Sequence, residues 1–157
     1  MISVATKNTA VQCKTVIYTI GYEGLSFETF LRRLNDAGIK QILDVRCNPI
    51  SRKPGFSKKQ LAGRLSVAEI DYFHFPELGI PASMRRVLNS KSDYQHLFDE
   101  YESEILPHAT EQMKIVAKLL EKMPSALLCF ENDRECCHRT RLAIVISNQT
   151  GFLKKYL

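Results

Sequence analysis

The chain has 157 residues, of which 45% are apolar and 25% are charged, and Lys and Arg exceed Asp and Glu by five (22 − 17). This length and composition fit one globular domain with a single hydrophobic core, and no apolar run approaches the ~20 residues of a membrane-spanning helix. The mild basic excess favours an anionic small molecule or nucleic acid as the partner. No block of like charges is long enough to form a nucleic-acid-binding tail.

The predicted elements alternate along the chain. Residues 1–15 lack an apolar signal core, so we expect a loose N-terminal segment, a single α/β domain over residues 16–157 and a cytoplasmic location. Apolar and β-branched runs predict strands at 16–20, 41–45, 70–75 and 125–130. Helical periodicity predicts helices at 26–34, 57–66, 92–106, 110–123 and 136–147, with Ser26 and Ser57 as N-caps.

This alternation predicts the fold class. Strands that alternate with helices form parallel sheets, so we expect a single-domain Rossmann-like α/β three-layer sandwich with a mainly parallel sheet of about four to five strands. Right-handed crossovers place helices on both faces of such a sheet. Ligands bind beyond the carboxyl ends of its strands, so the residues that follow each strand are the candidate site.

The segments after the four predicted strands carry glycines, acids, arginines, histidines and a thiol. Gly21 and Gly24 permit a close backbone approach or a positive φ, with a plain turn as the alternative, and they do not form a GxGxxG dinucleotide fingerprint. The candidate substrate-binding residues are Gly21, Glu23, Arg46, Ser51, Lys58, His74, His138 and Arg139. The candidate catalytic residues are Asp44, Glu131 and Cys137.

Asp44 ends an otherwise apolar strand. A buried acid there needs a partner, and Arg46 or Arg139 could supply it. An aspartate beside an arginine stays ionised and could orient a substrate hydroxyl or a base. The alternative is a salt bridge that only fixes the loop. After the fourth predicted strand, Glu131 is the better general acid–base candidate.

Cys137 lies near the start of the last predicted helix. The helix dipole and nearby Arg139 predict a lowered pKa for its thiol, which suits a nucleophile or a metal ligand. The alternative is that it is a core residue. Arg139 and the helix N-terminus together indicate an anion site, and His138 is a candidate base or ligand. His96 and His108 lie on polar helical stretches, which predicts that both are surface residues.

The strand-end motifs also resemble a known family. The chain is similar to the bacterial and archaeal family catalogued as domain of unknown function 488. Its motifs appear in the family's order and cover roughly residues 16–147: Tyr18-Thr-Ile-Gly-Tyr-Glu-Gly24, Leu43-Asp-Val-Arg46 with Pro49, Ser51-Arg-Lys-Pro-Gly-Phe-Ser-Lys58, Tyr72-Phe-His-Phe-Pro-Glu-Leu-Gly79, and Leu128-Cys-Phe-Glu131 with Cys137-His-Arg139. The resemblance implies a Rossmann-like fold and no established reaction.

Two functional hypotheses follow from these residues. The first is an enzyme that acts on a phosphate-bearing or nucleotide-like substrate. The candidate catalytic residues would do the chemistry, which would be glycosyl transfer or hydrolysis if the paired acids cooperate. Arg46, Lys58 and Arg139 would bind the anion. The second is a nucleic-acid-binding module that uses the basic loop at 51–59 and exposed aromatic side chains, Tyr22 and Phe56. A plain solvated loop is the alternative for the basic segment.

The cysteines raise two further hypotheses. The segment 43–46 is similar to part of rhodanese-like sulfurtransferases, and Cys129 and Arg134 are spaced as in their active loop, but Cys129 is predicted to lie inside a strand. A metal site could use Cys137, His138, His74 or Cys47, although the five cysteines include no CxxC pair and we assign no metal ligands. No cofactor or oligomeric state follows from the sequence.

Overall fold

The computed structural model describes residues 14–85 and 87–157, so residues 1–13 of the expected N-terminal segment lie outside it. Five strands form one all-parallel sheet in the order β3-β2-β4-β1-β5. The strands are β1 (Val16–Gly21), β2 (Gln41–Asp44), β3 (Asp71–His74), β4 (Ser125–Cys129) and β5 (Leu153–Tyr156).

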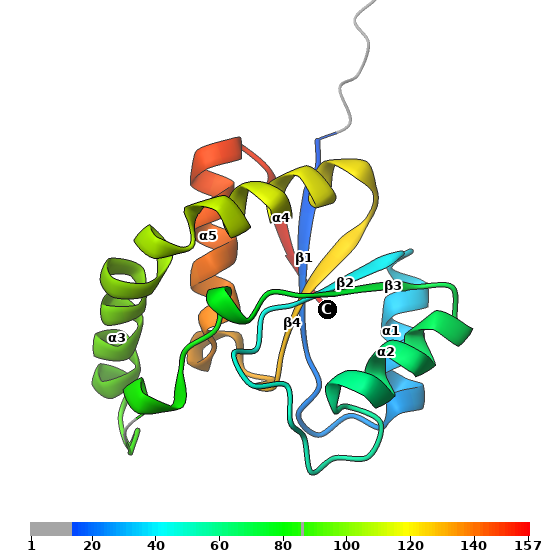
Figure 1. Cartoon of the computed structure of the whole chain (residues 1–157), viewed down its shortest axis with the longest axis horizontal. Coiled ribbons are helices and arrows are strands. Elements are labelled where there is room, and N and C mark those ends of the chain that lie inside the picture. The colour runs from blue at the N-terminus through cyan, green and yellow to red at the C-terminus, as the bar shows by residue number, and fades with distance from the viewer. Residues whose placement is uncertain (1–13, 86) are drawn as a thin grey trace, which may run out of the picture.

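Helices cover both faces of the sheet, as Figure 1 shows. One face carries α1 (Phe27–Asp36) and α2 (Lys58–Val67), and the other carries α3 (Lys91–Glu100), α4 (Thr110–Lys122) and α5 (His138–Thr150). The predicted three-layer α/β sandwich is confirmed. Short turns join these elements: 3-10 turns at Pro76–Leu78, Ala82–Met84, Leu106–His108 and Arg134–Cys136, and a π-helical turn at Tyr101–Ile105.

Successive strand residues point to opposite faces, and this alternation divides the core in two. Leu43 and Leu127 pack with α3, α4 and α5. Their neighbours Ile42 and Leu128 pack with α1 and α2. The central strands are therefore buried on both sides, which explains why their sequences are continuous apolar runs rather than alternating patterns.

Local sequence explains most element boundaries. The Ser26 side chain caps α1 by accepting from the Thr29 N–H at 3.1 Å. Ser57 precedes α2 as predicted, but its side chain makes no capping hydrogen bond. The helix predicted at 92–106 instead ends at Glu100 and continues as the π-helical turn before Pro107. Helix α5 begins at His138 rather than at residue 136, because Cys137 is extended (φ −133°, ψ 133°).

Strand β5 lies beyond the four strands that apolar runs predicted. Its sequence, Leu-Lys-Lys-Tyr, is mostly exposed, and among the described strands β5 pairs with β1 alone, at the edge of the sheet. Edge strands with lysines carry no continuous apolar signal and resist pairing with other chains. The total of five strands agrees with the predicted range.

The strand order places the loop after β4 between the loops that follow β1 and β2. The chain leaves β1 and β2 toward α1 and α2, but it leaves β4 toward α5 on the other face. Because β4 lies between β2 and β1, the loop after β4 turns to the opposite face from the loops after both of its neighbouring strands. This is the topological switch point at which ligands bind in open parallel sheets.

Candidate functional site

A saturated ion pair occupies the carboxyl end of β2. Arg46 donates from Nε to Oδ1 of Asp44 at 2.8 Å and from Nη2 to Oδ2 at 2.6 Å. The Tyr72 hydroxyl donates to the same Oδ2 at 2.5 Å. Arg46 Nη1 donates to the Tyr22 hydroxyl and to the Phe56 carbonyl, both at 2.9 Å. We call Asp44, Arg46 and Tyr72 the clamp.

The clamp balances its own charge. Asp44 is fully buried and Arg46 is 4% exposed. Burial acts to lower the pKa of Arg46, but the hydrogen bonds and charge of Asp44 outweigh it and raise that pKa. Burial and the neighbouring Asp44 raise the pKa of the Tyr72 hydroxyl. Both carboxylate oxygens are engaged, and the partner is Arg46 rather than Arg139, so the contacts of Asp44 favour the structural alternative.

The two aromatic residues expected at the surface are buried. Tyr22 is 2% exposed and Phe56 is fully buried. Their rings stack with centroids 4.3 Å apart, and Arg46 bonds both residues. The prediction that they are exposed to contact bases was wrong, because the hydrogen bonds from Arg46 to Tyr22 and to the Phe56 carbonyl hold both residues against the core.

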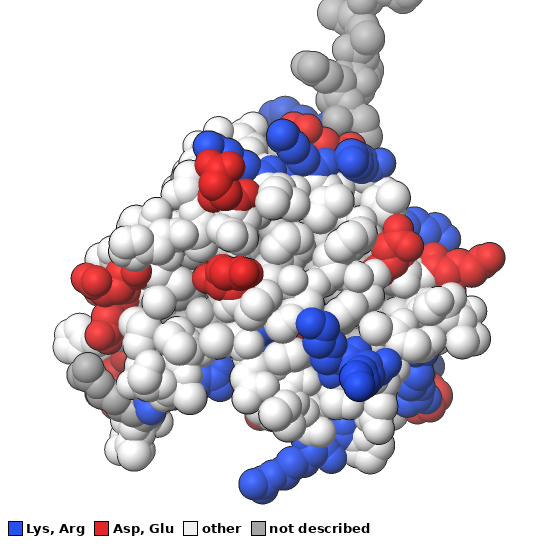
Figure 2. Space-filling model, in the orientation of Figure 1, with Lys and Arg blue, Asp and Glu red and all other residues white. Residues whose placement is uncertain are grey.

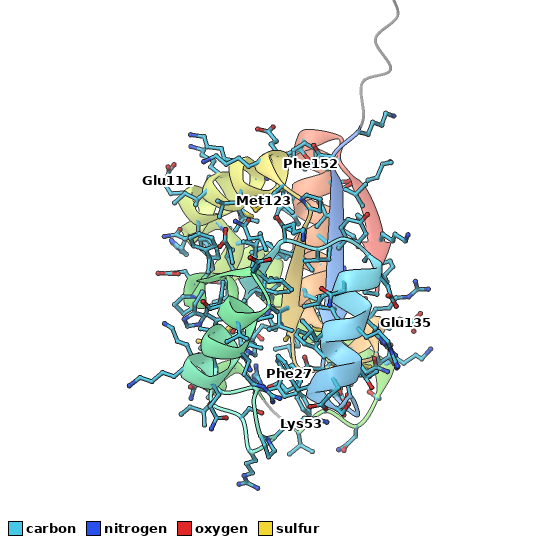
Figure 3. The ribbon with its side chains drawn as sticks, turned by 90° about the vertical axis from the view of Figure 1, so that its right-hand side faces the viewer. Phe27, Lys53, Glu111, Met123, Glu135 and Phe152 are labelled. Carbon is cyan, nitrogen blue, oxygen red and sulfur yellow. The ribbon has the colours of Figure 1, made fainter. Side chains whose placement is uncertain are left out.

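A basic pocket opens at the same edge of the sheet. This cavity of about 420 Å³ is lined by residues that follow β1, β2 and β4, together with Arg85: Tyr22, Arg46, Asn48, Ile50, Ser51, Arg52, Lys53, Arg85, Cys129 and Phe130. Among the residues that the structure describes, its lining includes four basic side chains and no carboxylate. Figure 3 shows Lys53 at one end of the molecule, opposite Met123 and Phe152, and Figure 2 shows Lys and Arg side chains projecting at the lower end.

Ser51 lies in the lining of the pocket and shapes its loop. Its hydroxyl accepts from the Lys53 N–H at 3.2 Å. Lys58 is the first residue of α2, and its Nζ contacts Nδ1 of His74, the last residue of β3, at 3.0 Å. His74 Nε2 faces the Arg46 carbonyl at 2.8 Å, so this nitrogen must donate. Lys58 and His74 therefore brace the loop after β2 and are not among the lining residues of the pocket.

A cluster of thiols, a carboxylate and an imidazole follows β4. The thiols of Cys129 and Cys137 donate to the same oxygen of Glu131, Oε2, at 3.0 and 3.2 Å. The Cys129 sulfur also lies 3.6 Å from His138 Nδ1. We call these four residues the thiol cluster. It adjoins the basic pocket through Cys129 and a smaller cavity of about 190 Å³ through Glu131 and His138.

The orientation of His138 fixes its tautomer. Its Nε2 lies 2.9 Å from the Val45 carbonyl, which can only accept, so Nε2 carries the hydrogen. In the neutral ring Nδ1 therefore presents its lone pair to the thiols. Tyr101 supports this orientation, with its ring edge-on to the imidazole (centroids 5.5 Å apart) and its hydroxyl donating to the Leu78 carbonyl at 2.7 Å.

The pKa directions within the cluster differ from the sequence-based expectation for the thiol. Burial, followed by contact with Cys129, raises the pKa of Cys137 well above its ordinary value. The expected lowering by the helix dipole and Arg139 was wrong because the sulfur is buried. Burial acts to raise the pKa of Glu131, but hydrogen bonds from Cys129, from its own N–H and from Cys137 lower it. Burial acts to lower the pKa of His138, whereas Cys137, the Val45 carbonyl and Glu131 raise it.

Three predicted residues hold the loop after β4 in place. A Cβ on Gly21 would overlap the Glu131 carbonyl, so this glycine serves the close approach of two backbones. The Glu23 carboxylate accepts from the Asn132 N–H at 3.1 Å. Arg139 donates to the carbonyls of Glu131 and Asn132. Arg139 is 2% exposed, and among the described residues its Nε has no hydrogen-bond partner.

The structure therefore separates the predicted residues into groups. It brings Glu131, Cys137 and His138 together, and it places Arg46 and Ser51 at the basic pocket. Arg85 was not among the candidates, and Cys129 entered only through the sulfurtransferase hypothesis. Cys129 is the last residue of β4, as expected for a strand residue, and its sulfur contacts a carboxylate and an imidazole rather than a sulfurtransferase-type anion loop. Its position at the strand end was the available signal.

The family comparison agrees with the motifs. The family described as "Domain of unknown function DUF488" matches residues 26–146. The chain belongs to this family. The matched span of the DUF488 domain holds the clamp, the thiol cluster and almost the whole lining of the basic pocket. No curated protein and no solved structure matched the chain significantly.

The helices give one further observation. Among residues 14–85 and 87–157, no helix combines the length and apolar character needed to cross a bilayer.

Proposed function

We propose that this DUF488 domain is an enzyme that binds a phosphate-bearing, nucleotide-like substrate in the basic pocket and uses Glu131 as its general base. The observation that carries the proposal is the meeting of the basic pocket and the thiol cluster at the switch point of the sheet. Cys129 belongs to both, because it lines the pocket and donates to Glu131.

The charge of the pocket supports an anionic ligand. Arg52 and Arg85 are exposed at the pocket and Lys53 is half-buried, so their charges face the space that a ligand would fill. The volume of about 420 Å³ is in the range of small-molecule sites. Arg46 already donates to Asp44, Tyr22 and Phe56. It therefore shapes the floor of the pocket and contributes positive charge there without contacting the ligand directly.

Glu131 is the better of the two acids for proton transfer. Its lowered pKa keeps it ionised at neutral pH, as a general base requires. Arg46 and Tyr72 engage both oxygens of Asp44, which leaves neither oxygen free to accept a proton from a substrate. In this proposal Asp44 is a positioning residue that holds Arg46, and Cys137 belongs to the surroundings of Glu131.

Nucleic-acid binding is the weaker candidate. The basic loop at 51–59 is partly exposed and could contact a phosphate backbone. However, Tyr22 and Phe56 are buried and offer no stacking surface for bases. A pocket of limited volume fits a mononucleotide or sugar phosphate better than a strand.

A thermal-shift screen of nucleotides, sugar phosphates and short DNA and RNA tests the proposal. A small anionic ligand at ~100 times its Kd should stabilise the wild type by about 2.7 kcal/mol. The stabilisation should be lost in the double variant Lys53→Gln/Arg85→Gln and kept in Lys122→Gln, an exposed lysine at the end of α4. Stabilisation by nucleic acid alone, or an equal loss in Lys122→Gln, would contradict it. With a ligand identified, Glu131→Gln should retain binding and lose turnover.

A further inference from the structure

We infer that Cys129, Cys137 and His138 form a metal site for a thiophilic divalent cation such as Zn²⁺, with Glu131 beside the fourth coordination position. This inference goes beyond the proposed anion binding and does not depend on it. The three residues are the one group in the described part of the chain whose Cys, His or carboxylate ligand atoms gather within 4.8 Å of one another.

The Cys129–His138 separation fits a tetrahedral ion, and the Cys137 sulfur lies within 4.8 Å of both ligand atoms. Zinc bonds of ~2.3 Å to sulfur and ~2.0 Å to nitrogen place neighbouring ligand atoms roughly 3.3–3.8 Å apart in a tetrahedron. The Cys129 sulfur and His138 Nδ1 lie 3.6 Å apart. Two sulfurs and one imidazole nitrogen form a soft set that selects zinc over Mg²⁺ or Ca²⁺.

The histidine is already arranged as a ligand. Its Nε2 donates to the Val45 carbonyl, which leaves the Nδ1 lone pair facing the sulfurs. Metal-binding histidines are commonly held this way, with the second nitrogen bonded to a backbone carbonyl or carboxylate. The edge-on contact with Tyr101 restricts rotation of the ring. His138 and Cys137 are each at most 3% exposed, so little side-chain freedom is left to lose on binding.

The charge balance of the cluster is compatible with a divalent cation. Glu131 receives both thiol hydrogens on one oxygen, and the described part of the chain contributes no salt bridge to this carboxylate. A divalent ion would replace the two thiol protons, so its two charges would be matched by the two thiolates and the net charge of the cluster would not change. The buried guanidinium of Arg139, held against the Glu131 carbonyl, would offset the remaining negative charge.

The location of Glu131 indicates that the fourth coordination position of the ion holds a water. Structural zinc sites use four protein ligands, whereas catalytic sites use three and hold a water. Glu131 and His138 line the cavity of about 190 Å³, and Arg85 lines both this cavity and the basic pocket. A water on the ion would lose its proton to the Glu131 carboxylate and leave a hydroxide beside the pocket.

Metal content is the first test. Protein expressed without a histidine tag, stripped with chelator, kept reduced and titrated with Zn²⁺ should bind one ion per chain. Cys129→Ser, Cys137→Ser and His138→Gln should each weaken zinc binding by more than about 100-fold, beyond the roughly 10–100-fold effect of outer-shell changes. The neighbouring thiol variant Cys136→Ser is the matched control, because this sulfur contacts Asp133 instead of the cluster, and it should bind zinc as the wild type does.

Glu131→Gln distinguishes a base from a ligand. It should retain stoichiometric zinc, with a loss of at most about 100-fold in affinity. A loss as large as that of Cys137→Ser would overturn the three-ligand assignment. Equal zinc uptake by Cys136→Ser and Cys137→Ser would overturn the site.

Cobalt spectroscopy keeps the inference testable if the cysteine variants fail to fold. Wild-type protein loaded with Co²⁺ should show thiolate-to-cobalt charge-transfer absorption and the intense visible bands of a tetrahedral centre. A Co²⁺ spectrum without thiolate bands would overturn the inference. The test needs no substrate, so its failure is separate from failure of the anion-binding proposal.

Discussion

The clamp and the thiol cluster both contain a carboxylate at the carboxyl edge of neighbouring strands, yet their electrostatic situations are opposite. Asp44 is fully buried and faces a cation that bonds both of its oxygens. Glu131 is only half-buried and accepts from two neutral thiols on one oxygen. A carboxylate whose charge and hydrogen bonds are satisfied internally stabilises the fold, whereas one that faces donors able to lose protons is available for a ligand or a reaction.

Removal of the buried acid should have the largest effect on stability. Asp44→Ala would leave the Arg46 guanidinium buried without its anion, and breaking a buried pair from one side costs about 3–5 kcal/mol. Urea denaturation measures this loss. Asp71→Ala is the control, because Asp71 is exposed at the start of β3 and should change stability by less than about 0.5 kcal/mol. If both variants lost similarly little free energy of unfolding, the buried pair of the clamp would not stabilise the fold and its contrast with the thiol cluster would not hold.

The approach of the β1 and β4 loops is tested by two glycines. Gly21→Ala would force its Cβ into the Glu131 carbonyl, so we expect a loss of about 1–3 kcal/mol together with weaker zinc binding. Apart from the backbone of its own helix, no described atom lies within 4 Å of a Cβ added to Gly63 in α2. Gly63→Ala should therefore stabilise the protein, by up to about 1 kcal/mol. Thermal unfolding of the two variants should give shifts of opposite sign, and a stabilised Gly21→Ala would show that the loop does not need this close approach.

A third carboxylate, that of Asp93, is hydrogen-bonded like Asp44 but lies at the solvent-exposed start of a helix. Asp93 forms a capping box at the start of α3, where its Oδ2 accepts from the Asn89 and Ser90 N–H groups, each at 2.8 Å, and these bonds lower its pKa. Because the folded-state pKa is depressed, its contribution is present above the unfolded value of about 3.9 and is lost as pH falls through the folded pKa.

The expected effect of Asp93→Asn is the smallest of the series, because the side chain is solvated. Its melting temperature should lie slightly below that of the wild type at pH 7, and the two should converge in acid below the folded pKa. The same difference at both pH values would show that the charge of Asp93 does not stabilise α3.

The sequence determined the layered architecture through local signals. Fully apolar runs such as Leu127 and Leu128 predicted strands buried on both faces, and Ser26 marked a helix start. The alternation of strands and helices was sufficient for the parallel sheet and for the edge at which the polar residues gather. The exposed strand β5 lacked such a signal, since its lysines are in contact with solvent and do not pack in the core.

Only the tertiary structure decided what the candidate residues contact. Sequence spacing could not show that Arg46 would occupy both oxygens of Asp44, or that Cys129 would share a carboxylate oxygen with Cys137. It predicted a lowered pKa for the Cys137 thiol from the helix dipole, but burial sets the direction. The physical reason is that periodicity reports which side of an element is apolar, whereas desolvation and partner geometry depend on residues distant in the chain.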